Sequence, residues 1–198
     1  MANTKFSTSS IKQGLVKSKS MLVGNTGDIS DFESIATTTV VSNVSSVTFS
    51  SIPATYTHLQ IRAIARGTQA DISDQIGIQF NGDTSANYVI HQFGGNGSIV
   101  FSGGNASQTR LVPAYIAGSS TAANIFGVGV INILDYANTN KYTTVRGLSG
   151  WDSNGAGYTI LRSGLWLNTN AITSIVFTPD SGSFVQYSSF ALYGIKTA

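Results

Sequence analysis

The sequence contains no cysteine among its 198 residues. No disulfide can therefore stabilise the fold, and no thiolate can bind a metal or act as a nucleophile. Charge is also scarce, because charged residues make up 10% of the chain against about 25% in an average globular protein. The surface must consist largely of neutral Ser, Thr, Asn and Gly residues. This composition suits an extracellular or particle-bound protein better than a cytosolic enzyme.

The few charges are distributed unevenly along the chain. Four of the eleven basic residues lie in the first twenty positions, where no acidic residue occurs. From Ser34 onward, seven basic residues accompany six acidic ones. This is not the even basic field of a domain that binds duplex nucleic acid, and no apolar run reaches the ~20 residues of a membrane span. We expect neither nucleic acid nor a membrane as a partner.

Groups that carry acid–base chemistry are few. Such chemistry usually needs paired carboxylates or a histidine, and Glu33 is the only glutamate. His58 and His91 both fall in strand-like runs, and no Gly-x-Ser-x-Gly motif provides a nucleophile elbow. Asp71 and Asp74 supply too few oxygen ligands for a calcium site, so we interpret them as a solvated hairpin tip. We expect no enzymatic activity, no cofactor and no bound metal.

Apolar residues from Ser34 onward recur with period two, which is typical of β-strands. In HLQIRAIAR, we expect Arg62 and Arg66 on the exposed face. The segment 124–134, NIFGVGVINIL, is apolar on both faces and predicts a central strand that is covered on both sides. The predicted core comprises Leu59, Ile61, Ile78, Phe80, Phe126, Val128, Val130, Phe177 and Leu192.

Turn signals separate these apolar runs. Asn-Gly pairs at 81–82, 96–97 and 154–155 favour hairpins, because both residues tolerate positive φ. The spacing predicts about ten strands and no convincing helix. We expect an all-β fold, an antiparallel jelly-roll-like β-sandwich of about ten strands over residues 33–198. An extended N-terminal arm, residues 1–32, precedes it.

The two tryptophans are candidates for stacking on sugars or bases. Trp151 begins the turn WDSNGAG, and Trp166 lies between Leu165 and Leu167. We expect Trp166 to be partly in the core. For Trp151, exposure to a sugar is one interpretation, and packing under the hairpin is the better one.

The arm has too few apolar residues to build a core of its own. Fixing the backbone of each residue costs ~1–2 kcal/mol, so an ordered arm needs a partner surface or a neighbouring copy. Its lysines favour an acidic surface, and IKQGLVKS has some character of a strand that could add to a sheet edge. The residues predicted to bind a partner are Lys5, Phe6, Lys12, Leu15, Lys17 and Lys19.

The order of several motifs resembles a β-rich module of tailed-bacteriophage virion proteins. The most diagnostic stretches are NGDTSANY, residues 81–88, and LDYANTNKY, residues 134–142. The resemblance covers roughly residues 33–196 and implies a non-enzymatic structural protein on the particle surface.

The resemblance does not indicate in which part of the virion the protein is located. A capsid decoration (cement) protein, attached to the major capsid protein or other virion proteins through its arm, is favoured because the module fills nearly the whole chain. The alternative is a tail-fibre or head-fibre module that binds host surface glycans through the loops around Trp151 and residues 93–108. A glycan-active enzyme is a third hypothesis, which the sparse carboxylates disfavour. The resemblance and the symmetry of particle-surface proteins imply a homo-oligomer, which we expect to be a homotrimer.

Overall fold

The structure, a computed structural model, describes residues 31–196 as one compact unit. The partner-binding residues assigned to the arm lie outside the described residues. Between residues 31 and 196 there is no helix, and twelve strands form two antiparallel sheets. The predicted all-β, antiparallel sandwich is confirmed, with two strands more than expected.

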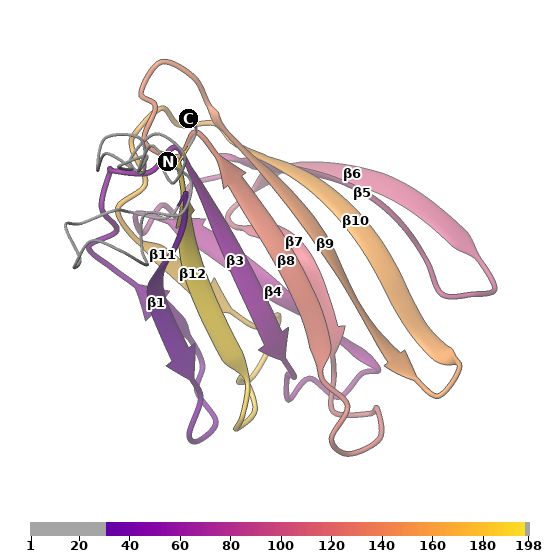
Figure 1. Ribbon diagram of the computed structural model, residues 1–198. Helices are drawn as coiled ribbons and strands as arrows, with labels where there is room; N and C mark the ends of the chain where they lie inside the picture. The colour runs from indigo at the N-terminus through magenta and orange to yellow at the C-terminus, as the bar shows by residue number, and fades with distance from the viewer. Residues whose placement is uncertain (1–30, 197–198) are drawn as a thin grey trace, which may run out of the picture. The chain divides into compact units, whose positions relative to one another are not determined.

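The larger sheet has eight strands and the smaller has four. In spatial order, the larger sheet contains β1 (Phe32–Thr39), β12 (Ser189–Ile195), β3 (His58–Ala65), β8 (Gly127–Leu134), β9 (Thr143–Ser153), β10 (Ala156–Trp166), β5 (Tyr88–Gly95) and β6 (Val100–Gln108). The smaller sheet contains β2 (Val47–Phe49), β11 (Ile175–Thr178), β4 (Ser73–Phe80) and β7 (Leu111–Ala117). Figure 1 shows the larger sheet in front of the smaller one.

Two hairpins widen the larger sheet. The chain alternates between the sheets from β1 to β4, and then β5 and β6 form a hairpin within the larger sheet. The hairpin of β9 and β10 joins the same sheet beside β8. In Figure 1 the tips of both hairpins extend away from the strands of the smaller sheet.

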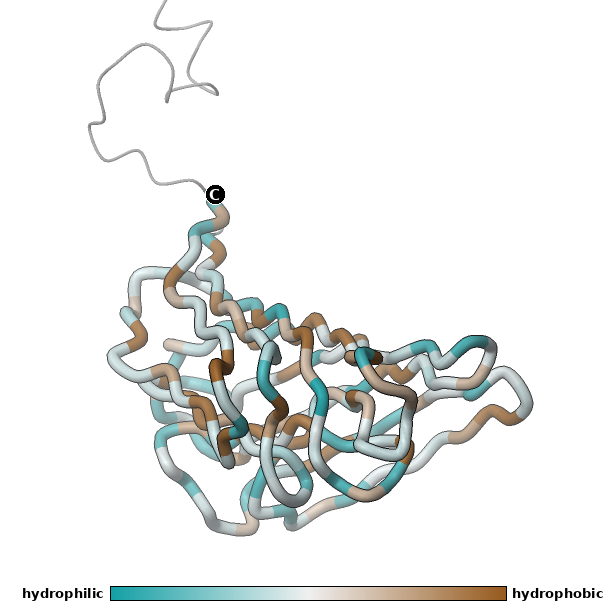
Figure 2. Tube along the Cα trace, turned by 90° about the horizontal axis from the view of Figure 1, so that it is seen from below, coloured by the Kyte–Doolittle hydropathy of each residue, from teal (hydrophilic) through white to brown (hydrophobic). Residues whose placement is uncertain are grey.

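The core lies between the two sheets and follows the period-two pattern. Figure 2 shows hydrophobic segments gathered in the interior of the sandwich. Six residues of the predicted core are fully buried, and their alternation is confirmed: Leu59, Ile61, Ile78, Phe80, Phe177 and Leu192. These side chains come from β3, β4, β11 and β12, so both sheets contribute to one core.

The prediction that 124–134 is covered on both sides is wrong, because only one face of β8 is buried. β8 is central in the larger sheet, but Val128 and Val130 point outward and are exposed, while Phe126 precedes the strand and is half-buried. Glycines occupy the first two inward positions, Gly127 and Gly129, because β7 passes close by. A Cβ at Gly127 would lie 2.6 Å from a backbone atom of β7, and one at Gly129 would lie 3.1 Å from the Ala114 side chain.

Arg66 is buried, although the alternation placed it on the exposed face. Its guanidinium donates hydrogen bonds to four carbonyl groups in the connection between β7 and β8. These belong to Ser119, Thr121, Ala122 and Ile125. Since burial of a cation requires such donors to be satisfied, this connection folds around Arg66.

Arg162 on β10 is a second buried cation, and it ties the two sheets together. Its Nη1 donates to the Val112 carbonyl of β7 at 2.6 Å, and its guanidinium lies 4.4 Å from the centroid of the Tyr115 ring. Its Nη2 donates to the side chain of Gln92 on β5. Burial lowers the pKa of Arg162.

The Asn-Gly pairs mark turns, but only those at 96–97 and 154–155 form the hairpins predicted from them, because the pair at 81–82 leads from β4 in the smaller sheet to β5 in the larger sheet. Asn154 and Gly155 both have positive φ, and Ser153 pairs with Ala156, so these two residues form the loop of the hairpin between β9 and β10. Asn81 and Gly82 likewise have positive φ directly after β4. Gly97 has positive φ in the loop between β5 and β6.

Candidate partner-binding face

The outward side of the larger sheet, which we call the outer face, carries an ordered set of side chains. Residues directly opposite one another in an antiparallel sheet point to the same side. The register of β3, β8, β9, β10 and β5 therefore aligns their outward residues in rows that cross the sheet. The central row consists of Arg62, Val130, Leu148, Leu161 and Phe93.

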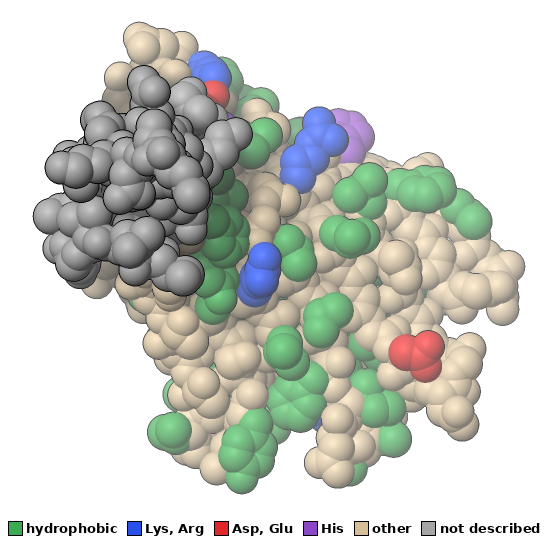
Figure 3. All heavy atoms as spheres, viewed as in Figure 1, with side chains coloured by type: hydrophobic (Ala, Val, Ile, Leu, Met, Phe, Trp, Pro, Cys, Tyr) green, Lys and Arg blue, Asp and Glu red, His purple; other side chains and the backbone are tan. Residues whose placement is uncertain are grey.

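Most of this central row is apolar and exposed. Leu148, Leu161 and Phe93 expose 55%, 48% and 57% of their surface. The next row adds exposed Ile64 and Val128 from β3 and β8. Figure 3 shows hydrophobic side chains spread over this face with few charged ones among them. Contiguous exposed apolar side chains on adjacent strands are typical of a surface that binds a partner.

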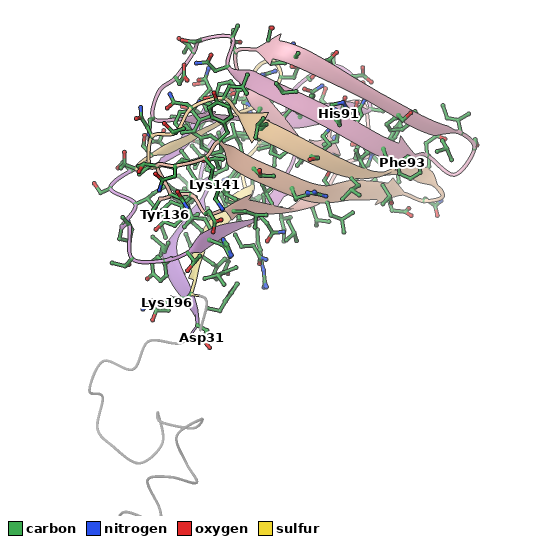
Figure 4. The ribbon with its side chains drawn as sticks, turned by 90° about the horizontal axis from the view of Figure 1, so that it is seen from above. Asp31, His91, Phe93, Tyr136, Lys141 and Lys196 are labelled. Carbon is green, nitrogen blue, oxygen red and sulfur yellow. The ribbon has the colours of Figure 1, made fainter. Side chains whose placement is uncertain are left out.

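A row of polar side chains runs beside the apolar row. It consists of Gln60, Asn132, Arg146, Ser163 and His91, one from each of the same five strands. The Gln60 amide donates to the Asn132 side chain at 2.9 Å. Figure 4 shows His91 and Phe93 on β5, near the far end of the sheet from Asp31. The outer face thus combines an apolar strip with hydrogen-bonding groups along one side.

An aromatic group borders the outer face at the β12 end. The rings of Phe32 and Tyr193 stack with centroids 4.8 Å apart, and the Arg62 guanidinium lies 5.3 Å from both ring centroids. Arg62 Nε also donates to Gln60 Oε1 at 3.0 Å. Because its charge contacts these groups, Arg62 is held in place at this border.

A hollow of about 550 Å³ lies where the outer face meets the tip of the β9–β10 hairpin. Its lining includes Val128, Val130 and Leu148 from the outer face, with Trp151 and Tyr158 from the hairpin. Trp151 is only 7% exposed, and its ring centroid lies 5.0 Å from that of Tyr158. The interpretation that Trp151 packs under the hairpin is therefore confirmed. Trp166 is fully buried, which is more than the partial burial expected.

His58 lies beside Asp135 but not in the arrangement of a hydrolytic triad. His58 Nδ1 accepts a hydrogen bond from the Asp135 backbone N–H at 2.9 Å and lies 3.3 Å from Asp135 Oδ1. A triad histidine would instead donate from Nδ1 to the carboxylate. Lys141 donates to the same carboxylate, and this hydrogen bond is the main cause of the lowered pKa of Asp135. The group holds the turn after β8, where Asp135 has positive φ.

The sequence suggested that Asp74 belongs to a solvated hairpin tip, and this interpretation is wrong. Asp74 is 1% exposed, and its Oδ1 accepts the backbone N–H groups of Gln75 and Asp180 at 2.7 and 2.8 Å. Burial raises the pKa of Asp74. Gly67 is required beside it, because a Cβ there would lie 1.7 Å from Asp74 Oδ2. Within residues 31–196, no group of three or more His, Asp or Glu side chains is placed to hold a metal ion.

The outer face was missed at the sequence level, although it left a signal. Apolar residues on both sides of 124–134 were interpreted as complete burial, whereas Val128 and Val130 belong to an exposed surface. Leu148, Leu161 and Phe93 lie on three different strands, β9, β10 and β5, so no local pattern in the sequence groups them. Only the register of four adjacent strands brings these residues into one row.

Comparisons with known proteins gave no match: no protein-family model, no curated protein and no solved structure is significantly similar to the chain. Among the described residues, no helix has the length and apolar character needed to cross a membrane. The outer face is therefore interpreted from its own geometry.

Proposed function

We propose that this chain is a non-enzymatic structural protein of a bacteriophage virion, attached to the particle as a capsid decoration protein. The observation that carries the attachment is the exposed apolar row of the outer face, Val130, Leu148, Leu161 and Phe93. Burial of such side chains against another protein is favourable by ~25 cal/mol for each Å² of apolar surface removed from water. The choice of a virion as the assembly rests on the motif resemblance described above.

The strand order supports a jelly-roll-like fold for this protein. Without the two added hairpins, the larger sheet has the order β1-β12-β3-β8 and the smaller sheet has the order β2-β11-β4-β7. Successive strands then alternate between the sheets, except that β4 and β7 are paired neighbours in the smaller sheet. This is the order of a long antiparallel hairpin that is rolled into two layers, with β4 and β7 at its closed end. Jelly rolls are common among viral capsid domains and lectins. Since one fold serves many functions, this order supports the proposal without carrying it.

The extended N-terminal arm is part of the same proposal. In this view the arm adds a second attachment to the particle, and the outer face supplies the first. The partner is the major capsid protein or another virion protein, and the protein lies on the particle surface.

The test is co-sedimentation of the purified full chain with particles that lack it. The double variant Leu148→Gln, Leu161→Gln removes the middle of the apolar row while leaving the core intact, because both side chains are about half exposed. We expect it to bind at least about tenfold more weakly, since a few central apolar residues dominate most interfaces.

A matched control is Ile72→Gln, which changes an apolar residue of similar exposure, 48%, outside the larger sheet. This control should bind like the unmodified protein. Equal binding by the double variant and the unmodified protein would remove the outer face from the proposal.

A second candidate function is the binding of host surface glycans by a fibre module, and Phe93 is the observation that favours it. This exposed ring lies on the same strand face as His91, beside the polar row. Sugars bind where an aromatic ring can stack on them next to hydrogen-bonding side chains. A glycan array probed with the full chain tests this candidate. Binding should be lost in Phe93→Ala and kept in Tyr187→Ala, which truncates an exposed ring elsewhere.

A further inference from the structure

We infer that the free edge of β6 pairs with β6 of a second copy of this chain, joining two larger sheets into one. Among the described residues, 31–196, β6 is the last strand of the larger sheet and has a neighbouring strand, β5, on one side only. It is nine residues long and nearly all exposed. Its backbone therefore presents a row of N–H and C=O groups at an open edge.

Comparison with the other three edge strands shows what β6 lacks. Natural edge strands avoid unwanted pairing by being short, by carrying charge or proline, or by containing a bulge. β2 has three residues, and β7 contains Pro113. β1 contains Glu33 and a break in register between Ser34 and Ala36. β6, with the sequence VFSGGNASQ, has neither a charged residue nor a proline, and its break in register is confined to the end after Asn105.

The first half of β6 is regular enough to pair. Its register with β5 is continuous from Val100 to Asn105, and the irregularity falls after that, where Ser107 has positive φ. Phe101 anchors this half, because its ring packs over Gly94 of β5 and lies 6.1 Å from the Tyr158 ring centroid. The edge is thus held in an extended conformation before any partner arrives.

The hydrogen-bonding groups that face the open edge follow from the turn. The N–H of Asn96 donates to the carbonyl of Ile99 at 3.2 Å, so these two residues form a hydrogen-bonded pair. Such pairs alternate along an antiparallel ladder. The N–H and C=O groups of Val100, Ser102 and Gly104 are therefore directed away from β5.

A two-fold axis beside Ser102 would place the outward N–H and C=O groups of one β6 opposite the same groups of β6 in the second copy. Ser102 then lies opposite Ser102 of the second copy, and Val100 lies opposite Gly104. No like charges meet, because the strand has none. Directly opposite residues share a face, so the exposed Phe93 rows of both copies would lie on the same side of a continuous sheet. The interface is isologous, as in most soluble dimers, so the assembly inferred from β6 is a dimer in place of the homotrimer that the resemblance implies.

The test uses a charge at the centre of this contact. Sedimentation equilibrium of the full chain should show a reversible dimer. Ser102→Lys and Ser102→Glu should each weaken the dimer by about tenfold or more, because like charges would lie directly opposite one another. A mixture of the two variants should restore dimers. Thr37→Lys is the matched control, since Thr37 is exposed at the other end of the same row, on β1.

A second measurement uses the absence of cysteine from the chain. Ser102→Cys should be joined to a second copy by a short cross-linker that reacts with two thiols, and Thr37→Cys should not. A monomer at all concentrations would overturn the inference. A dimer or trimer that is insensitive to Ser102→Lys, with no cross-linking through Ser102→Cys, would also overturn it. These readouts need no virion particle, so they are independent of the proposed attachment.

Discussion

Asp83 illustrates how one carboxylate links distant parts of the chain at the residue scale. It lies just after β4, where it accepts hydrogen bonds from Trp166 Nε1 at 2.8 Å, from the Asn87 side chain at 3.1 Å and from the Ser85 N–H at 2.9 Å. Burial acts to raise its pKa, but these hydrogen bonds outweigh that effect and lower the pKa of Asp83 to about 2. The buried indole of Trp166 thereby gains a partner for its N–H.

The lowered pKa makes stability depend on pH at this residue. The ionised form is favoured in the folded state, so its contribution is complete above the unfolded pKa of about 3.9 and is lost as the pH falls towards about 2. We expect Asp83→Asn to lower the free energy of unfolding by about 1–2 kcal/mol at pH 7, after allowance for solvent screening. Urea unfolding at pH 7, 4 and 2.5 should show that the difference in free energy of unfolding between the unmodified protein and Asp83→Asn becomes smaller as the pH falls. If this difference does not change with pH, the stabilising role of ionised Asp83 is contradicted.

Phe80 tests the packing of the core. It is fully buried on β4, and its ring lies 5.4 Å from that of Trp166 and 6.3 Å from that of Tyr88. Replacing it with Ala should cost ~3–5 kcal/mol, because the truncation leaves a cavity among rigid rings. A loss below about 1 kcal/mol in urea unfolding would show that Phe80 does not face the core.

At the scale of elements, close contact between the sheets depends on glycine in β9. A Cβ at Gly147 would lie 2.0 Å from the carbonyl oxygen of Pro113 in β7. A backbone atom cannot move aside as a flexible side chain can. Gly147→Ala should therefore lower the free energy of unfolding by ~1–3 kcal/mol, as overpacking does in other cores. Gly103→Ala in β6 is the control, because its nearest contact would be an ordinary 3.7 Å. Equal stability of the two variants would show that β7 can shift.

The need for glycine where the two sheets approach closely explains which strands could be predicted from the sequence and which could not. The faces of β3 and β4 were predicted correctly, because Leu59, Ile61 and Ile78 alternate with polar neighbours. β8 was predicted wrongly, because its valines face solvent while glycines accommodate β7. Hydropathy cannot reveal a requirement for small residues that arises from a strand distant in the sequence.

The candidate site was predictable only in fragments. Each row of the outer face combines residues from β3, β8, β9, β10 and β5, and their register follows from turns and long-range pairing. Arg66 was expected in solvent because the alternation along HLQIRAIAR placed it on the exposed face, and Asp74 was expected there because its segment was interpreted as a hairpin tip. Their burial depends on hydrogen bonds to backbone groups of loops that are distant in the sequence, and no local pattern predicts these hydrogen bonds.

At the scale of the whole molecule, the arm can be tested apart from the sandwich. The twelve described strands and the core that they enclose lie within residues 31–196. Removal of residues 1–30 should leave the melting temperature nearly unchanged and should weaken attachment to particles. Thermal unfolding and co-sedimentation measure the two effects. Full binding by the shortened chain would show that the sandwich attaches without the arm.

The lysines of the arm make a separate prediction. Changing Lys5, Lys12, Lys17 and Lys19 together to Gln should weaken attachment most at low salt, because exposed charges are screened over about 8 Å in physiological salt. Each lysine alone should contribute little, roughly 0–1 kcal/mol. Co-sedimentation across a salt series would test this, and a salt-independent loss would point to a contact that does not depend on charge.

Asp31 and Lys196 lie side by side, and the backbone N–H of Lys196 donates to the Asp31 carbonyl at 2.9 Å. Because its two ends are adjacent, the domain can be inserted into a surface loop of an unrelated protein without forcing the two ends of that loop apart. Figure 4 places His91 and Phe93 at the opposite end of the sheet. A fusion through residues 31 and 196 would therefore display the β5–β6 hairpin outward, as a scaffold for grafted recognition loops.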